Sequence, residues 1–249
     1  MKLRNFFVPV LLGLFSGCAV IEPYIQEFNV VPVAQEVEIG RQMASEVARQ
    51  MVVIENPSLT GPLRSMGNRL VSALPRRDFD YQFFVVQDAS PNAFTIPGGS
   101  IYVHTGLLNF VSDASELAGV LGHEIGHAYE RHPARSISRA YGVDRLSSRI
   151  LNKEPGQLTK LVLEMAKGGL LSRYGREDER RADDIGHELL RRSGYKTDGL
   201  LRFLRKLQSL EKPGGRKLAF LASHPPTPER VARLEALEEG NRSAPNALL

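Results

Sequence analysis

The sequence lacks the features that define several protein classes. It has one cysteine among 249 residues, Cys18, so no disulfide can form within the chain and its stability must come from packing. No apolar run approaches the roughly 20 residues that a helix needs to cross a bilayer. There is also no block of like charges, no repeat of fixed period and no low-complexity tract. These absences argue against a disulfide scaffold, a repeat protein and a membrane-embedded enzyme.

What is present is ordinary globular composition. Hydrophobic residues make up 42% of the chain and charged residues 24%, which is enough for one sizeable core and not obviously for two. The formal net charge of +4 is a weak basic bias. On a chain of this length such a bias usually reflects a solvated surface rather than a nucleic-acid site.

The first 18 residues predict export. Residues 1–5 carry two positive charges, residues 6–15 are nearly all apolar, and Ser16 and Gly17 precede Cys18. A basic start, a short apolar run and small residues are typical of a signal peptide, here residues 1–17. The pattern resembles a bacterial lipoprotein signal, in which cleavage occurs before the cysteine and Cys18 then carries the lipid.

Two neighbours of Cys18 qualify that prediction. Phe15 stands where such signals usually have an aliphatic residue, so secretion with cleavage near Ala19, or a buried N-terminal helix, stays open. Ala19 resembles the residue that follows the cysteine in lipoproteins sorted to the outer membrane. We therefore expect a chain in the bacterial cell envelope, lipid-anchored at the outer membrane and facing the periplasm.

The rest of the chain predicts an α+β domain that is mainly helical. Residues 18–35 are expected to form a tether, residues 36–240 one domain and residues 241–249 a flexible tail. Short strands followed by helices indicate a small sheet with packed helices rather than a doubly wound fold. We expect helices over 36–55 and 59–74, a strand over 80–87, a hairpin that turns at Pro97-Gly98-Gly99, and mostly helices after Leu108.

The segment after Asp113 predicts a helix that carries a metal site. Asp113 and Glu116 have capping-box spacing, and the helix is expected to run on to His132. His123 and His127 are four residues apart and share one face, where two imidazoles can hold one zinc ion. Glu124 lies beside them and can work on a water molecule at the metal.

A zinc peptidase also needs a third protein ligand. A later histidine is excluded, because that pattern requires glycine and histidine where Glu130 and Pro133 stand. A charged helix predicted over residues 176–192 offers Glu179, with Asp183 on the same face to accept the N–H of a ligating histidine. On spacing alone the preference for Glu179 is weak. Glu177, Asp178 and Asp184 stay open, as does a salt-bridged surface helix without any ligand.

Taken together, the motifs of this chain resemble those of a known family. It is similar to the zinc metallopeptidases that include the CaaX prenyl protease, HtpX and the periplasmic proteins BepA and LoiP, over about residues 36–237. The matching motifs are Asn92-Ala-Phe, Pro97-Gly-Gly, residues 115–127 with His-Glu-Ile-Gly-His, Glu179-Arg-Arg-Ala-Asp183, Gly194-Tyr195 and Ser223-His-Pro-Pro-Thr227 with Arg230.

The resemblance implies a zincin-type (gluzincin) fold and one Zn²⁺ per chain. It makes Glu179 the third zinc ligand and Asp183 its neighbour that supports a ligand histidine. We expect no counterpart here of the spanning helices of the prenyl protease or of the helical-repeat extension of BepA. The expected relatives are therefore single-domain, LoiP-like lipoprotein peptidases.

His224 and Arg230 complete the candidate residues. His224 lies in a proline-rich loop before a helix that Thr227-Pro228 begins, and a turn histidine in solvent is the simplest reading. Near zinc it could instead stabilise the oxyanion of a tetrahedral intermediate, or fill a fourth metal position. Arg230 could bridge this loop to the site.

Two functions follow as hypotheses. The first is a metalloendopeptidase that uses Glu124 as general base and acid on unfolded or misassembled envelope proteins, with the strand around residues 101–103 pairing with the substrate. The second is a lipoprotein that binds clients or assists assembly, with a latent zinc site closed by His224. Nucleic-acid binding by the Arg-rich helix is excluded by the export signal.

Overall fold

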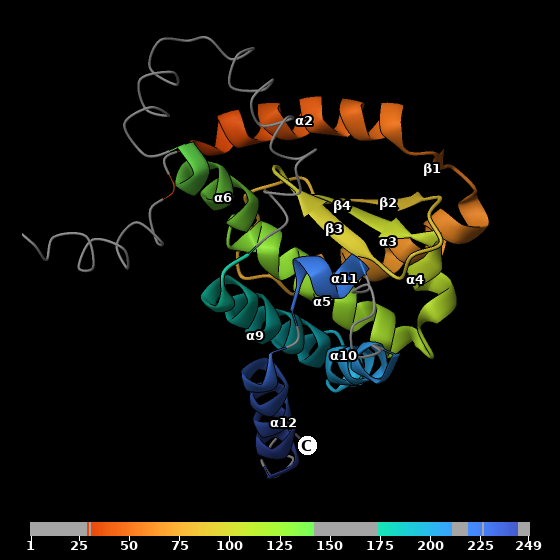
Figure 1. Ribbon diagram of the computed structural model, residues 1–249, viewed down its shortest axis with the longest axis vertical. Coiled ribbons are helices and arrows are strands. Elements are labelled where there is room, and N and C mark those ends of the chain that lie inside the picture. The colour runs from red at the N-terminus through yellow and green to blue at the C-terminus, as the bar shows by residue number, and fades with distance from the viewer. Residues whose placement is uncertain (1–28, 30, 142–173, 211–218, 226, 244–249) are drawn as a thin grey trace, which may run out of the picture.

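A computed structural model describes residues 29, 31–141, 174–210, 219–225 and 227–243 (Figure 1). The elements are α2 (Val33–Gln50), β1 (Val53–Ile54), α3 (Pro57–Ser72), β2 (Gln82–Val86), β3 (Ala93–Ile96), β4 (Ser100–His104), α4 (Thr105–Phe110), α5 (Ala114–Tyr129), α6 (His132–Tyr141), α9 (Arg176–Arg192), α10 (Gly199–Leu210), α11 (Ala219–Ser223) and α12 (Pro228–Ser243). The prediction of a mainly helical α+β domain with a small sheet is confirmed.

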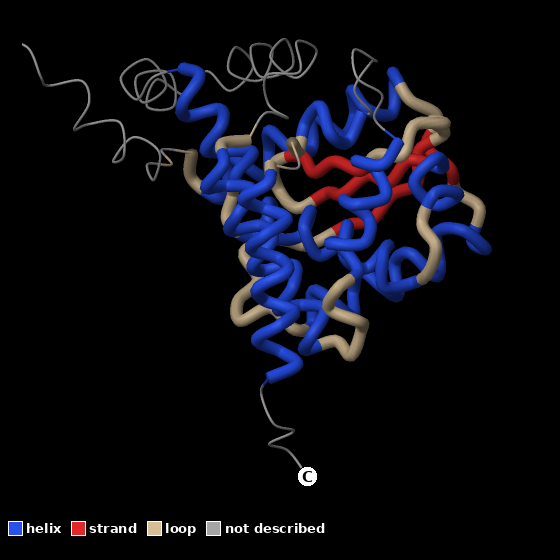
Figure 2. Tube along the Cα trace, turned by 60° about the horizontal axis from the view of Figure 1, so that its bottom comes forward, coloured by secondary structure: helices blue, strands red, loops and turns tan. Residues whose placement is uncertain are grey.

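The sheet has the strand order β1-β2-β4-β3. β2 and β4 are parallel, while β1 and β3 pair antiparallel with their neighbours. The expected hairpin forms between β3 and β4, and its turn places Gly98 and Gly99 at φ of 83° and 88°, values that favour glycine. β3 is therefore an edge strand, and β4 has partners on both sides. Figure 2 shows the strands gathered in one layer with helices around them.

Each face of the sheet contributes to a different hydrophobic cluster because side chains alternate along a strand. Phe83 and Val85 join the large core with α3, α5 and α10, whereas Phe84 and Val86 lie in a smaller cluster with α2 and α6. Figure 1 shows α2 along one face of the sheet, with α5 and α9 on the opposite side. Phe84, Tyr102 and Phe94 stack across three strands on the α2 face.

Two predicted helices have clearly different bounds in the structure. The first helix runs from Val33 to Gln50 rather than over 36–55, because Met51 turns extended and β1 pairs with β2. The helix expected to continue to His132 ends at Tyr129, since Arg131 adopts a left-handed φ of 57°. α6 then starts in a new direction. The helix predicted over 176–192 has the predicted bounds.

Several predicted segments lie outside the described residues. These are the signal peptide with Cys18, most of the tether over 18–35 and most of the tail over 241–249. Among the residues that the structure describes, no helix combines the length and the apolar character needed to span a membrane.

Candidate metal centre

α5 carries the His-Glu-Ile-Gly-His segment through the middle of the molecule. Asp113 caps the helix by accepting the backbone N–H groups of Ser115 and Glu116, as its position predicts. Every residue from Ala118 to Ala128 is buried. Burying two histidines and a glutamate so deeply is unfavourable unless other groups compensate for the lost hydration.

α9 lies directly against α5 because small residues line the contact. A Cβ atom added to Gly186 would lie 2.9 Å from the backbone nitrogen of His123, and one added to Gly126 would lie 2.8 Å from the carbonyl oxygen of Ala182. The two backbones are therefore in van der Waals contact. As a result of this packing, the side chains of Glu179 and Asp183 point towards the histidines of α5.

His224 reaches the same place from a third segment. It follows α11, and its backbone N–H donates to the carbonyl of Phe220. Arg230 of α12 holds the next residue by donating to the carbonyl oxygen of Pro225 over 3.0 Å. The imidazole ring of His224 packs against the ring of Phe220, with 4.7 Å between the ring centroids.

These segments bring four donor residues together, namely His123, His127, Glu179 and His224, whose ligand atoms all lie within 4.8 Å of one another. His123 Nε2 is 3.0 Å from His127 Nε2 and 3.2 Å from His224 Nδ1. Glu179 Oε1 lies 3.0 Å from His224 Nδ1 and 3.5 Å from His127 Nε2. Ligand atoms about 2.0–2.1 Å from a tetrahedral zinc ion are separated by roughly 3.3 Å.

The donor set fits a divalent cation better than it fits a hydrogen-bond network. Three imidazole nitrogens and a carboxylate point at one spot, and Glu179 Oε2 forms an ion pair with the guanidinium of Arg230, 2.5 Å away. Burial lowers the pKa of His127 well below its usual value, so this ring is neutral, as a metal ligand must be. Burial by itself would raise the pKa of Glu179, but His224 and the hydrogen bonds from the histidines hold it well below the usual range. Two histidines and a glutamate favour zinc among the common ions.

Glu124 stands beside the donor group without belonging to it. Its side chain is fully buried, and neither carboxylate oxygen has a hydrogen bond of ordinary geometry with a described residue. Among the described residues, the basic atom that lies nearest to it is His224 Nε2, 3.4 Å from Oε1. Burial raises the pKa of Glu124, which is the direction that favours proton uptake near neutral pH.

Asp183 and Arg230 support the donors from behind. Asp183 Oδ1 lies 2.9 Å from His123 Nδ1, the ring nitrogen that faces away from the other donors. The guanidinium of Arg230 donates to both oxygens of Asp183 over 2.8 Å and lies 2.5 Å from Glu179 Oε2. Arg230 therefore contacts α9 and the His224 loop at once.

The acidic alternatives on α9 separate clearly. Glu177 pairs with Arg180 and Arg181 on the outer face of the helix, and Asp184 pairs with Arg233. Asp178 is buried but faces arginines of α6. Of the four candidates, Glu179 alone joins the donor group.

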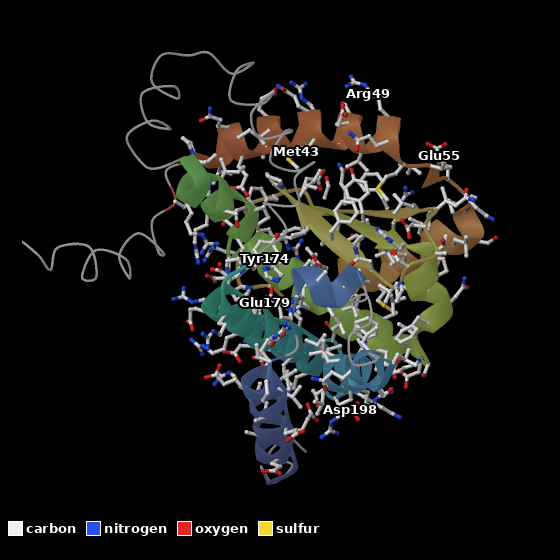
Figure 3. All side chains as sticks on the ribbon, viewed as in Figure 1. Met43, Arg49, Glu55, Tyr174, Glu179 and Asp198 are labelled. Atoms are coloured by element: carbon white, nitrogen blue, oxygen red, sulfur yellow. The ribbon has the colours of Figure 1, made fainter. Side chains whose placement is uncertain are left out.

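Other residues at the site escaped the sequence reasoning. His132 is fully buried with Nδ1 2.8 Å from His127 Nδ1, and Tyr174 stacks on the His127 ring with 3.9 Å between centroids. Tyr174 precedes α9 and Glu179 lies in its first turn, so the two share one end of that helix (Figure 3). His187 on α9 is also buried, at 7% exposure, but it hydrogen-bonds Glu238 of α12 rather than a member of the donor group. The sequence signal that could have pointed to His132 is its position five residues after His127.

Comparisons with known proteins agree with the motifs. The chain is 28% identical to the beta-barrel assembly-enhancing protease of Escherichia coli K12 over 233 residues, which are 87% of this chain and 46% of that protein. The chain thus spans about half the length of these first relatives. It is 29% identical over 204 residues to the metalloprotease YcaL of the same organism, covering 80% of this chain and 74% of YcaL. It is 26% identical over 249 residues to the metalloprotease LoiP, covering 94% and 96%.

The family comparison extends over most of the domain. The model of peptidase family M48 matches residues 57–238, from the start of α3 to the last turns of α12, and so includes every residue of the donor group. The resemblance inferred from the motifs is thereby confirmed. The chain belongs to peptidase family M48.

Proposed function

We propose that this chain is a zinc-dependent endopeptidase with His123, His127 and Glu179 as its zinc ligands. The observation that carries the proposal is the buried donor group with Glu124, an uncoordinated carboxylate, next to it on the same helix. A zinc ion held there would polarise a peptide carbonyl and lower the pKa of a water molecule from 15.7 towards ~7. The names of the relatives, all proteases, support the same reaction.

The chain's own residues then perform the proton transfers. Glu124 accepts a proton from the attacking water and later donates it to the leaving amine. Asp183 fixes the ring of His123 through Nδ1, and Arg230 fixes Asp183, so the ligand orientation does not depend on the metal alone. The buried walls around Glu124 keep bulk water away from this proton.

We propose that an extended substrate pairs with β3 rather than with the strand over 101–103. That strand is β4, whose two edges are already paired, so the earlier expectation is wrong. The N–H of His104 donates to the carbonyl oxygen of Asn92, so these two residues form a hydrogen-bonded pair. Hydrogen-bonded pairs alternate along an antiparallel ladder, so the backbone N–H and C=O groups of residues 92, 94 and 96 point towards β4. The backbone groups of Ala93 and Thr95 consequently point away from β4. An extended peptide that pairs with them needs no particular sequence, which suits unfolded polypeptides.

The finer setting is also a proposal. We place the enzyme in the bacterial envelope, anchored by lipid at Cys18 to the outer membrane, with unfolded or misassembled envelope proteins as substrates. The signal-like first 18 residues support the anchor. The name of the beta-barrel assembly-enhancing protease supports an envelope substrate.

One observation favours a second candidate, a client-binding lipoprotein whose metal site is latent. His224 Nδ1 lies 3.2 Å from His123 Nε2 and 3.0 Å from Glu179 Oε1, which are separations expected between two ligands of one metal ion. With His224 as a fourth ligand, the metal would have no free coordination position for a substrate. We propose that this is the resting arrangement of the peptidase and that substrate displaces His224. A permanently closed site would bind clients without cutting them.

The test compares the full chain with Glu124→Gln in detergent, using casein as an unfolded substrate. Wild type should cut casein, lose activity with a chelator and regain it with zinc. Glu124→Gln should keep its zinc and lose at least about 10²-fold in rate. Undiminished cleavage by Glu124→Gln would sink the proposed mechanism, and zinc binding without cleavage by wild type would favour the latent site.

A further inference from the structure

The turn after α5 folds the chain back onto the metal centre. Arg131 adopts a left-handed φ of 57°, and its guanidinium donates to Glu36 of α2 over 2.7 Å, which holds the turn in place. α6 therefore starts with His132 pointing back towards α5. The ring of His132 is fully buried, 4.9 Å from the ring of His127.

The two rings meet through their Nδ1 atoms, which lie 2.8 Å apart. Nitrogens this close need one hydrogen between them, so one donates and the other accepts. His127 presents Nε2 to the other donors, and a ring that binds a metal through Nε2 carries its hydrogen on Nδ1. His127 is then the donor, His132 Nδ1 is the acceptor, and the hydrogen of His132 is on Nε2.

Beyond His132 stands a carboxylate held by arginines. His132 Nε2 lies 3.5 Å from Asp178 Oδ1. Asp178 is 3% exposed, and it pairs with Arg135 over 3.0 Å and with Arg139 over 2.6 Å, both from α6. The neutral ring of His132 therefore has a carboxylate on its hydrogen-bearing side.

We infer that His132 is a positioning residue for the metal ligand His127, acting with Asp178. The other ligand histidine has the same kind of support, because His123 Nδ1 faces Asp183, which Arg230 holds. For His127, the imidazole of His132 stands between the ligand ring and the carboxylate of Asp178. This inference rests on the proposed function, since it requires His127 to bind the metal.

A merely structural role makes a different prediction. If His132 only filled the core at the start of α6, an apolar side chain of similar size would replace it without affecting the metal. If it fixes the ring of His127, the side chain must offer an acceptor at the Nδ1 position. Asparagine offers its Oδ1 there, whereas leucine offers nothing.

The experiment measures zinc affinity by competition with a chromophoric chelator, together with the visible spectrum of the Co²⁺-substituted protein. His132→Leu should weaken zinc binding about 10- to 100-fold, the usual effect of removing a group that orients a ligand, and should alter the cobalt bands. His132→Asn should recover most of the affinity. Thermal denaturation of the metal-free variants separates these effects from a loss of folding.

His187→Leu is the matched control. His187 is also a buried histidine, but its Nε2 bonds to Glu238 of α12, 2.9 Å away and outside the donor group. This variant should keep the zinc affinity and the cobalt spectrum of wild type. The inference is overturned if His132→Leu binds zinc as tightly as wild type, or if His132→Asn is as weak as His132→Leu. Wild type that binds no zinc would overturn the proposed function as well, whereas zinc binding and cleavage that are insensitive to His132 would overturn this inference alone.

Discussion

We propose that His224 determines whether the metal centre is open to a substrate or closed. Its Nδ1 sits among the donors and its Nε2 is 3.4 Å from Glu124, so one ring contacts both the ligands and the proposed base. A fourth protein ligand occupies the position that a catalytic zinc site keeps free. If His224 is that fourth ligand, its ring must move before a peptide carbonyl can approach.

The first prediction concerns the removal of this ring. His224→Ala should increase the cleavage rate of a short peptide several-fold, because the displacement step disappears, and should weaken zinc binding. The rate is measured with a quenched fluorescent peptide at saturating zinc. A large fall in kcat with unchanged zinc affinity would mean that His224 stabilises the transition state instead.

A second residue-scale prediction concerns Glu36, a buried carboxylate in the first turn of α2. Burial raises its pKa to about 7, although Arg131 and the Gly98 backbone oppose this. The folded state therefore holds a proton that the unfolded state has already lost above its pKa of about 4.3, so stability falls as pH rises from about 5 to 8. The loss is at most about 3 kcal/mol.

Urea denaturation at a series of pH values checks this prediction. Glu36→Gln should flatten the decline in unfolding free energy between pH 5 and 8. Glu55→Gln, an exposed carboxylate at the end of β1, should leave the decline as it is in wild type. Equal slopes for Glu36→Gln and wild type would refute the assignment.

At the scale of elements, the contact between α5 and α9 sets the geometry of the donors. Gly122 and Gly186 touch backbone to backbone, and Gly126 meets Ala182 in the same way. The helix axes can approach closely only because these positions lack large side chains. We therefore expect an added side chain at this contact to move Glu179 away from the histidines.

Gly186→Ala tests this packing. The new Cβ atom would lie 2.9 Å from the backbone nitrogen of His123, so we expect a loss of about 1–3 kcal/mol in stability and weaker zinc binding. Gly61→Ala in α3 is the control, because its Cβ meets nothing within 4 Å. That variant should be neutral or slightly more stable, since alanine favours a helix. Similar behaviour of the two variants would contradict the packing argument.

The helices themselves were largely predictable from sequence, but their breaks were not. The N-cap at Asp113 and the charged stretch over 176–192 predict the start of α5 and the bounds of α9, because capping and periodicity are local signals. The end of α5 at Tyr129 depends on the contact between Arg131 and Glu36, which lie far apart in sequence. No local pattern reveals such a break.

The site was predictable to the same extent. His123, Glu124 and His127 follow from i, i+4 spacing on one helix. The choice of Glu179 over Glu177 or Asp178 depends on which face of α9 packs against α5. The contacts of the glycines between these helices set that face, and they are visible in the structure but not in the sequence. His132 was missed because its partnership with His127 requires the chain to reverse at Arg131.

At the scale of the whole molecule, the candidate metal centre draws its donors from distant parts of the chain. The donors come from α5, from α9 and from the loop after α11, and Arg230 of α12 links the last two. Figure 1 shows α12 projecting from the rest of the molecule beside α9. Binding a metal at this junction should stabilise the fold because the unfolded chain has no such site.

Metal removal is the corresponding prediction. A ligand present at 1,000 times its Kd stabilises by about 4 kcal/mol, so a chelator should lower the Tm by on the order of 10 °C in a chain of this size. Calorimetry with and without chelator measures the shift. His123→Ala should start from the lower Tm and show no further shift. A chelator effect of equal size in His123→Ala would place the stabilising metal elsewhere.

The most direct test of the account counts zinc in three forms of the full chain, namely wild type, Glu179→Gln and Glu177→Gln. Mass spectrometry of the metal after dialysis should find about one zinc in wild type and in Glu177→Gln, whose side chain lies on the outer face of α9 with Arg180. Glu179→Gln should retain little or none. Zinc absent from wild type, or held as tightly by Glu179→Gln as by Glu177→Gln, would contradict the account.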